Sequence, residues 1–239
     1  MDMIVRPYTG ISRKPRLLPI TIGLLHAMRG DTTPELQLPA TESWFLTQNP
    51  AVRTFRRLNG WGPMADFGIG WYPKTQRVEI MQFGDPFTTR SNWSSGFGAK
   101  GVVTWGMDEV SVAIELDQSA AMEDYREETI DRLIELALWL PSQGINIAPV
   151  HLPPWDQLRA QPVPTGWLGH DETANGIRGG KSDVGNKFPW PRFIDAIDTT
   201  PVPEPSDPLG ELAALSLKVI KLERDYNAHG HGPPVEATR

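Results

Sequence analysis

Residues 166–183 read GWLGHDETANGIRGGKSD, a stretch that combines His170, Lys181 and Asp183 with several glycines. Neutral imidazole and carboxylate are both good zinc ligands. A lysine two residues before the carboxylate could stabilise negative charge that develops during a reaction. The glycines predict a loop that folds back and returns Asp183 toward His170. The stretch therefore predicts a metal site whose third protein ligand comes from a distant part of the chain.

Bulk composition narrows the class of protein. The chain has 239 residues, of which 39% are hydrophobic, and this predicts one large globular domain. Its formal net charge is -6, whereas proteins that bind nucleic acid are usually basic, so nucleic acid is not an expected partner. The chain has no cysteine. A metal would therefore have to bind histidine, aspartate or glutamate.

Runs of apolar and β-branched residues predict the strands. They cover residues 17–26, 67–72, 77–83, 109–117, 145–151 and 166–169. The second and third runs are joined by Pro-Lys-Thr-Gln and predict a hairpin. Within the fourth run, we expect Val110, Val112 and Ile114 on one face.

Apolar side chains at three- and four-residue spacing predict a long helix at 119–140, with shorter helices at 41–48 and 191–197. Pro34 and Pro39 are expected to act as breakers. Strands that alternate with helices predict an α/β fold, with a central mixed sheet flanked by helices.

The remaining segments are expected to lack regular structure or to lie outside the main domain. Residues 1–18 are predicted to be irregular, and 84–108 to form a long surface loop. The main domain is expected to span residues 1–198.

Beyond the main domain, residues 199–209 are rich in proline and predict a stiff linker. Residues 210–228 predict a further helix, with a seam of apolar residues spaced as in a coiled coil. This helix either packs back on the domain, associates with a second copy or docks on a larger assembly. Residues 229–239 are expected to form a tail.

Histidine positions suggest where the missing ligand lies. His229 and His231 fall in the tail, and His151 is expected to be a structural, hydrogen-bonded side chain. His26 follows the first apolar strand and His170 follows the last, and such strand ends can converge at one edge of a sheet. Two histidines and Asp183 would leave a fourth tetrahedral position open. The spacing alone leaves open that either histidine is simply buried and hydrogen-bonded.

Several motifs match one family. The segment GHDE…GGKSDVGNKFPW resembles the Gly-His turn and the Phe-Pro-Trp ending of zinc-dependent N-acetylmuramoyl-L-alanine amidases, which are related to phage lysins and peptidoglycan recognition proteins. The segments GLLHA at 23–27 and VAIE at 112–115 resemble two strands of that family. The resemblance extends over roughly residues 17–198 and implies the amidase-like fold.

The resemblance also implies a set of roles. His26, His170 and Asp183 would bind Zn²⁺. Glu115 would act as the general base, taking a proton from water and passing it to the leaving amine. Lys181 would stabilise the oxyanion. The bond cleaved would join the lactyl group of N-acetylmuramic acid to L-alanine in peptidoglycan.

This chain departs from the family pattern in places. Trp93, implied to contact substrate, precedes Ser94 where the family has a histidine. Val184 replaces the usual proline, and one residue is inserted in the loop before the lysine. Many family members carry a tyrosine just before the hairpin turn, and Tyr72 stands close to that position.

Three alternatives remain beside the amidase. A phosphate-binding loop at GGKS requires glycine where Asn175 stands. A non-catalytic peptidoglycan-binding module would usually lack a zinc ligand. A structural phage virion component could carry an amidase-like fold.

The ends and hydropathy of the chain give expectations for location. The N-terminus has no apolar segment typical of a signal peptide, and no apolar run approaches the ~20 residues that span a bilayer. We expect synthesis in the host cytoplasm without membrane insertion, followed by release to the cell wall as a phage lysin or carriage in a virion.

Overall fold

The computed structural model describes residues 1–6, 16–28, 33–45, 65–87, 107–118, 124–154 and 164–199. The chain divides into two units, Met1–Asp198 and Thr199–Arg239. The predicted helix 210–228, the tail and nearly all of the linker lie outside the described residues, as does Trp93.

A six-stranded sheet forms the centre of the first unit, in the order β1-β4-β3-β5-β2-β6. Strands β3 and β4 form an antiparallel hairpin, and every other neighbouring pair is parallel. The strands are β1 Ile4–Val5, β2 Ile22–Met28, β3 Phe67–Tyr72, β4 Arg77–Gln82, β5 Ser111–Asp117 and β6 Gly166–Gly169. This confirms the predicted mixed sheet.

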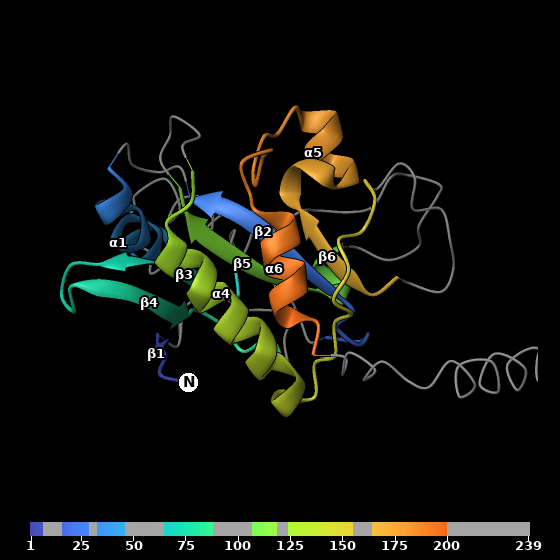
Figure 1. Cartoon of the computed structure of the whole chain (residues 1–239), viewed down its shortest axis with the longest axis horizontal. Helices are drawn as coiled ribbons and strands as arrows, with labels where there is room; N and C mark the ends of the chain where they lie inside the picture. Colours follow the sequence, from blue (N-terminus) through green and yellow to red (C-terminus); the bar gives the residue numbers. More distant parts are fainter. Residues whose placement is uncertain are drawn as a thin grey trace, which may run out of the picture. The chain divides into compact units, whose positions relative to one another are not determined.

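Helices cover both faces of the sheet. They are α1 Pro34–Phe45, α3 Met107–Val110, α4 Glu127–Trp139, α5 Ala174–Gly179 and α6 Trp190–Ile197, with the short 3-10 turns η1 Leu140–Gln143 and η2 His170–Glu172. Figure 1 shows α4 and α6 lying across one face, and residues of both helices join the largest core cluster. On the other face, Leu38 and Phe45 of α1 pack with Met28 and Phe83. No helix in the described ranges is long and apolar enough to cross a membrane.

Strand β2 lies inside the sheet and is buried along its whole length. Leu25 belongs to the core under α4 and α6, whereas Ile22 and Leu24 belong to a cluster on the opposite face. Side chains alternate along a strand, so His26 shares the face of Ile22 and Leu24. At Gly23, a Cβ atom would overlap the ring of Trp167, so this position requires glycine.

The hairpin, the strand at 166–169 and the helix near 191–197 agree with prediction, and other boundaries do not. Helix α1 begins at Pro34 and contains Pro39, so the assignment of these prolines as breakers was wrong. Pro34 is tolerated at the first position because its missing N–H would be unpaired there, whereas Pro39 lies beyond the first turn. Residues 46–48 of the predicted helix 41–48 lie outside the described residues.

The predicted helix 119–140 is shorter in the structure. It begins at Glu127, where two glutamates in the first turn favour the positive end of the helix dipole. Residues 119–123 lie outside the described ranges. Glu109 and Val110 belong to α3, so strand β5 starts later than predicted and Val110 packs in a different cluster from Val112 and Ile114.

Three further segments differ from expectation. The first apolar strand runs over Ile22–Met28 instead of 17–26. Residues 145–151 form no strand, and His151 makes only an isolated bridge with Trp167. Ile4–Val5 is a short strand that pairs with β4 and forms one edge of the sheet, inside a segment predicted to be irregular.

Candidate metal centre

His26 and Glu115 lie side by side at the carboxyl ends of two parallel strands. The register of β2 and β5 pairs these two residues directly. Neighbouring strands are about 4.8 Å apart, and paired residues of parallel strands point to the same face. His26 is 4% exposed, whereas Glu115 is partly exposed. The pairing of the two strands therefore places an imidazole and a carboxyl group next to each other on the same face of the sheet.

His170 joins them because it follows β6 directly. Strand β6 pairs with β2 as far as Gly169 opposite Leu25, and the residue that follows each of these two is a histidine. The ring centroids of His26 and His170 are 4.5 Å apart. The expected convergence of histidines at one sheet edge is thus present.

Asp183 returns to both histidines. Its Oδ2 lies 3.0 Å from Nδ1 of His170 and 3.5 Å from Nδ1 of His26. The candidate ligand atoms of the three residues all lie within 4.8 Å of one another. Tetrahedral zinc with bonds of about 2.0–2.1 Å would separate its ligand atoms by about 3.3 Å. The cluster therefore has dimensions that suit a small divalent cation.

The protonation states of His26 and Asp183 also suit a metal. Burial lowers the pKa of His26 to about 4, so its imidazole is neutral at pH 7. Neutral imidazole is the form that binds metals. Burial by itself would raise the pKa of Asp183, but hydrogen bonds from His170 and His26 outweigh it and hold the pKa well below its usual range. The Nε2 atom of His26 is buried without a hydrogen-bond partner in the described part of the chain, so Nδ1 carries the ring's polar contact.

Glu115 has an unusual acidity. Burial and the nearby negative charge of Asp183 raise the pKa of Glu115 to about 8. A carboxyl group whose pKa lies near neutrality can both accept and donate a proton there. Glu115 is therefore a candidate for proton transfer next to the three possible metal ligands.

Two other residues considered in the sequence analysis, Lys181 and Tyr72, are not part of this cluster. Lys181 is exposed, and its backbone N–H donates to the carbonyl of Gly176 at 2.9 Å. Its positive charge is near enough to disfavour protonation of His26. Tyr72 is 2% exposed, and its hydroxyl donates to Glu42 at 3.1 Å, away from the cluster.

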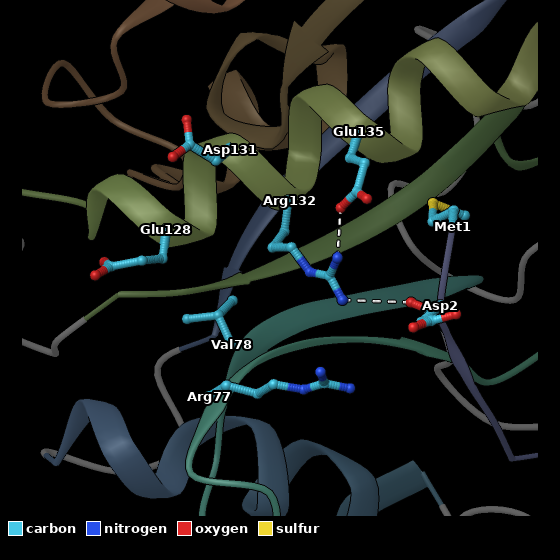
Figure 2. Close-up of a pocket in the computed structure, with 8 residues that line it drawn as sticks. All are labelled: Met1, Asp2, Arg77, Val78, Glu128, Asp131, Arg132 and Glu135. Atoms are coloured by element: carbon cyan, nitrogen blue, oxygen red, sulfur yellow. Dashed lines mark hydrogen bonds and ion pairs between the residues drawn. The ribbon is translucent and has the colours of Figure 1, made fainter.

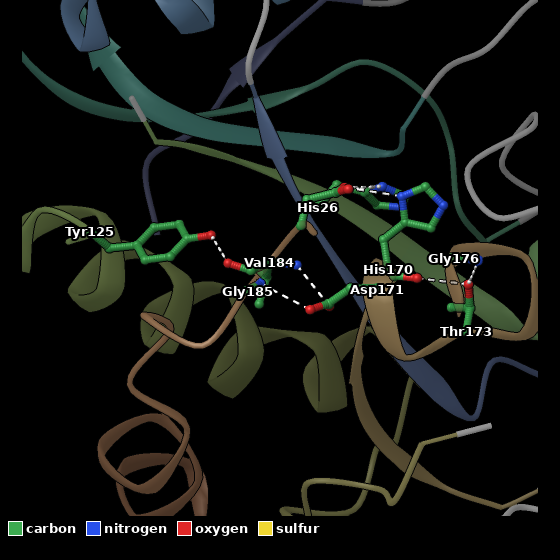
Figure 3. Close-up of polar contacts among 9 residues, drawn as sticks. His26, Tyr125, His170, Asp171, Thr173, Gly176, Val184 and Gly185 are labelled. Carbon is green, nitrogen blue, oxygen red and sulfur yellow. Dashed lines mark hydrogen bonds and ion pairs between the residues drawn. The ribbon is translucent and has the colours of Figure 1, made fainter. Parts of the chain in front are cut away.

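Part of the stretch after His170 is helical, which its many glycines had not suggested. Residues 174–179 form α5, although the sequence had predicted only a loop. The Thr173 hydroxyl donates to the carbonyl of His170 at 2.8 Å and accepts from the N–H of Gly176 at 3.0 Å (Figure 3). Threonine is a common N-cap residue, so Thr173 was the signal for this helix.

Asp171 also supports the site, and sequence reasoning missed it. Its carboxylate accepts the backbone N–H groups of Val184 and Gly185 (Figure 3). These contacts join the turn after β6 to the segment that follows Asp183.

His151 lies outside the cluster. Its Nε2 is 2.8 Å from a carboxylate oxygen of Glu172, and its ring stacks on Trp190 with centroids 3.8 Å apart. These contacts agree with the expected structural role.

A separate surface pocket of about 510 Å³ lies between β4, α4 and the first residues (Figure 2). Arg132 donates to the Glu135 carboxylate and to the backbone carbonyl of Asp2, which links α4 to the first residues of the chain. None of the predicted site residues lines it. Its lining residues are Met1, Asp2, Arg77, Val78, Glu128, Asp131, Arg132 and Glu135.

Comparison with known proteins supports the fold. No protein-family model and no curated protein sequence matches the chain. Among solved structures, a selenomethionine derivative of AmpD aligns with a TM-score of 0.53 and 17% identity, covering 82% of this chain and 94% of that one. The chain therefore shares the fold of AmpD.

Two further solved structures are more distant. The Staphylococcus aureus hydrolase AmiA, in complex with its ligand, aligns with a TM-score of 0.49 and 11% identity, covering 82% of each chain. The N-acetylmuramoyl-L-alanine amidase LysC from Clostridium intestinale aligns with a TM-score of 0.45 and 14% identity, covering 81% of this chain and 95% of that one.

Proposed function

We propose that this protein is a zinc-dependent N-acetylmuramoyl-L-alanine amidase that hydrolyses peptidoglycan. The observation that carries the proposal is the convergence of His26, His170 and Asp183, with Glu115 beside them. The AmpD-like fold and the Gly-His and Phe-Pro-Trp motifs support the same function.

His26, His170 and Asp183 would hold the zinc. Two neutral imidazoles and one carboxylate form a donor set typical of catalytic zinc sites, which keep one position open. When bound, zinc would polarise the scissile carbonyl and lower the pKa of a coordinated water. The carboxylate of Asp183 would offset part of the metal's charge, and the sheet would hold His26 in place.

Glu115 would move the proton. It would accept a proton from the attacking water and deliver it to the amine nitrogen as the amide bond breaks. Its pairing with His26 across β2 and β5 supports this role, and its partial exposure would keep it accessible to substrate. The high pKa of Glu115 applies to the metal-free site, since a nearby cation would favour the carboxylate.

Lys181 would stabilise the negative charge that develops on the carbonyl oxygen. It is exposed and two residues from Asp183, so its ammonium group can reach substrate without a burial cost. Trp93 would stack against glycan or peptide, an assignment that rests on the sequence resemblance because this residue lies outside the described ranges.

The biological setting follows from the same proposal. The protein would act on the cell wall as a phage lysin, after release from the host cytoplasm or as part of a virion. The helix predicted at 210–228 would serve self-association or docking to a virion.

Site variants test the assignment. We expect the wild type to release peptides with new N-terminal alanine from purified cell walls. His170→Ala should lose bound zinc and activity together. Glu115→Gln should keep zinc but lose activity by about 10²–10⁴-fold, because the general base is removed. Metal analysis and quantification of N-terminal alanine provide both readouts.

His151→Gln is the matched control, since it alters a histidine that contacts a carboxylate outside the cluster. It should retain zinc and activity. Binding of the wild type to cell walls without release of alanine would contradict the proposal and support a non-catalytic binding module.

A further inference from the structure

The segment after Asp183 is fixed by hydrogen bonds from two distant elements. Asp171 accepts the N–H of Val184 at 3.0 Å on Oδ1 and the N–H of Gly185 at 3.3 Å on Oδ2. From the other side, the Tyr125 hydroxyl donates to the carbonyl of Val184 at 2.9 Å. Figure 3 shows Tyr125 and Asp171 on opposite sides of Val184 and Gly185.

The same network reaches Asp183 itself. The backbone N–H of Asp171 donates to the carbonyl of Asp183 at 2.5 Å. Asp171 follows His170 directly, so one short turn carries both a histidine of the cluster and a residue that holds Asp183. We call Asp171 and Tyr125, with their hydrogen bonds to residues 183–185, the clamp. The separation between His170 and Asp183 is thus set by the backbone as well as by their side chains.

Asp171 is a positioning group because both of its oxygens are already engaged by backbone N–H groups. An ionised carboxylate accepts hydrogen bonds on both oxygens, whereas an asparagine amide accepts on only one. Tyr125 and Val184 are nearly fully buried, and the Tyr125 ring packs edge-on against Phe188 with centroids 5.5 Å apart. The clamp is therefore shielded from water on the tyrosine side.

Glycine at position 169 is consistent with this clamp. A Cβ atom there would lie 2.5 Å from Oδ1 of Asp171 and 3.4 Å from a methyl group of Val184. Glycine leaves the space that the Asp171 carboxylate occupies.

We infer that Asp171 and Tyr125 are positioning residues that hold Asp183 where it can bind zinc together with His26 and His170. The inference rests on the proposed zinc site. Groups that orient metal ligands typically change metal affinity by about 10–100-fold when they are replaced. The loss should appear in zinc affinity, because the three ligand side chains remain present.

Two variants of the full chain test this role. Asp171→Asn places an NH₂ group against a backbone N–H and should weaken zinc binding by at least about 10-fold. Tyr125→Phe keeps the packed ring, removes one hydrogen bond and should weaken zinc binding by about fivefold. Zinc dissociation constants are measured by competition with a chromophoric chelator, and thermal unfolding of the zinc-free proteins is followed in parallel.

Matched controls separate positioning from general destabilisation. Asp117→Asn alters another buried carboxylate that accepts two hydrogen bonds, from the Trp71 N–H and the Thr129 hydroxyl. Tyr72→Phe removes another buried tyrosine hydroxyl. Both controls should unfold at lower temperature yet keep wild-type zinc affinity. Saturating zinc should bring the activity of Tyr125→Phe back to within a few-fold of wild type.

The outcomes distinguish this inference from the proposed function. If wild type binds one zinc and both clamp variants bind it equally tightly, the clamp role is overturned and the amidase proposal stands. If wild type binds no zinc, both are overturned. If Asp171→Asn fails to fold, the zinc affinity of Tyr125→Phe decides alone.

Discussion

At the scale of single residues, Glu115 and His26 have opposite effects on stability as the pH changes. Burial and the nearby charge of Asp183 raise the pKa of Glu115 to about 8, from an ordinary value of 4.5. Between these values the folded state holds an extra proton, so stability falls as pH rises. The pKa of His26 is lowered from 6.5 to about 4, so over that range the unfolded state holds the extra proton and stability rises with pH.

We therefore predict that the zinc-free protein loses stability between about pH 6.5 and 8, where Glu115 acts without the opposing effect of His26. The loss should reach up to about 2 kcal/mol, because each pKa unit corresponds to about 1.4 kcal/mol. Urea unfolding at a series of pH values measures it.

The variant Glu115→Gln and added zinc provide the controls. The glutamine variant has no proton to release and should show a flat profile over this range. Bound zinc favours the carboxylate, so the zinc-loaded wild type should also lose the slope. An equal slope in Glu115→Gln would show that another group is responsible.

Sequence reasoning named the residues that we propose bear the chemistry and missed those that we propose position them. His26, His170 and Asp183 were named from residue type and spacing as well as from family motifs, and Glu115 was named from a family motif, because metal ligands and bases belong to few residue types. Asp171 escaped notice because its function depends on two backbone N–H groups, and no local pattern encodes that pairing.

At the scale of elements, the short helix α5 links His170 to the segment that carries Asp183. The helix ends at Gly179. The next residue, Gly180, has a φ of 61°, in the left-handed region that favours glycine. At Gly176, a Cβ atom would overlap the carbonyl of His170. Glycine here allows α5 to approach the turn that holds the histidine.

We predict that Gly176→Ala weakens zinc binding and lowers thermal stability, since the His170 backbone must move. Gly179→Ala is the matched change in the same helix. Its Cβ atom would meet only the Lys181 side chain, at 3.9 Å. Alanine stabilises a helix by up to about 1 kcal/mol relative to glycine.

Zinc affinity and unfolding temperature of the two variants provide the comparison. Gly179→Ala should match or exceed wild type in both. Equal zinc affinity in Gly176→Ala and Gly179→Ala would contradict the proposed close approach of α5 to His170.

Boundaries of elements were harder to predict than their existence. The two strands of the hairpin were predicted from their apolar runs and from the turn that joins them. The start of β5 and the extent of α1 did not, because tertiary contacts override local preference there. Pro39 lies inside α1, and Leu38 beside it is fully buried against the sheet.

At the scale of the whole molecule, the sheet and the candidate metal centre belong to Met1–Asp198. We predict that a protein ending at Asp198 retains the zinc affinity and the unfolding temperature of the full chain. Calorimetry and chelator competition on both proteins measure this. Failure of the shorter protein to fold would show that residues 199–239 contribute to the domain.

Sedimentation of the same two proteins tests self-association through residues 210–228. A full chain that sediments as a dimer, beside a monomeric shorter protein, would assign association to this segment. A monomeric full chain would count against it.

The central claim is that the His26, His170 and Asp183 cluster uses zinc to cleave peptidoglycan between N-acetylmuramic acid and L-alanine. Its most direct test is the release of new N-terminal alanine from purified peptidoglycan by zinc-loaded, chelator-treated and zinc-restored protein. We predict release by the first, none by the second and recovery in the third. A zinc-loaded protein that releases no N-terminal alanine would contradict the account.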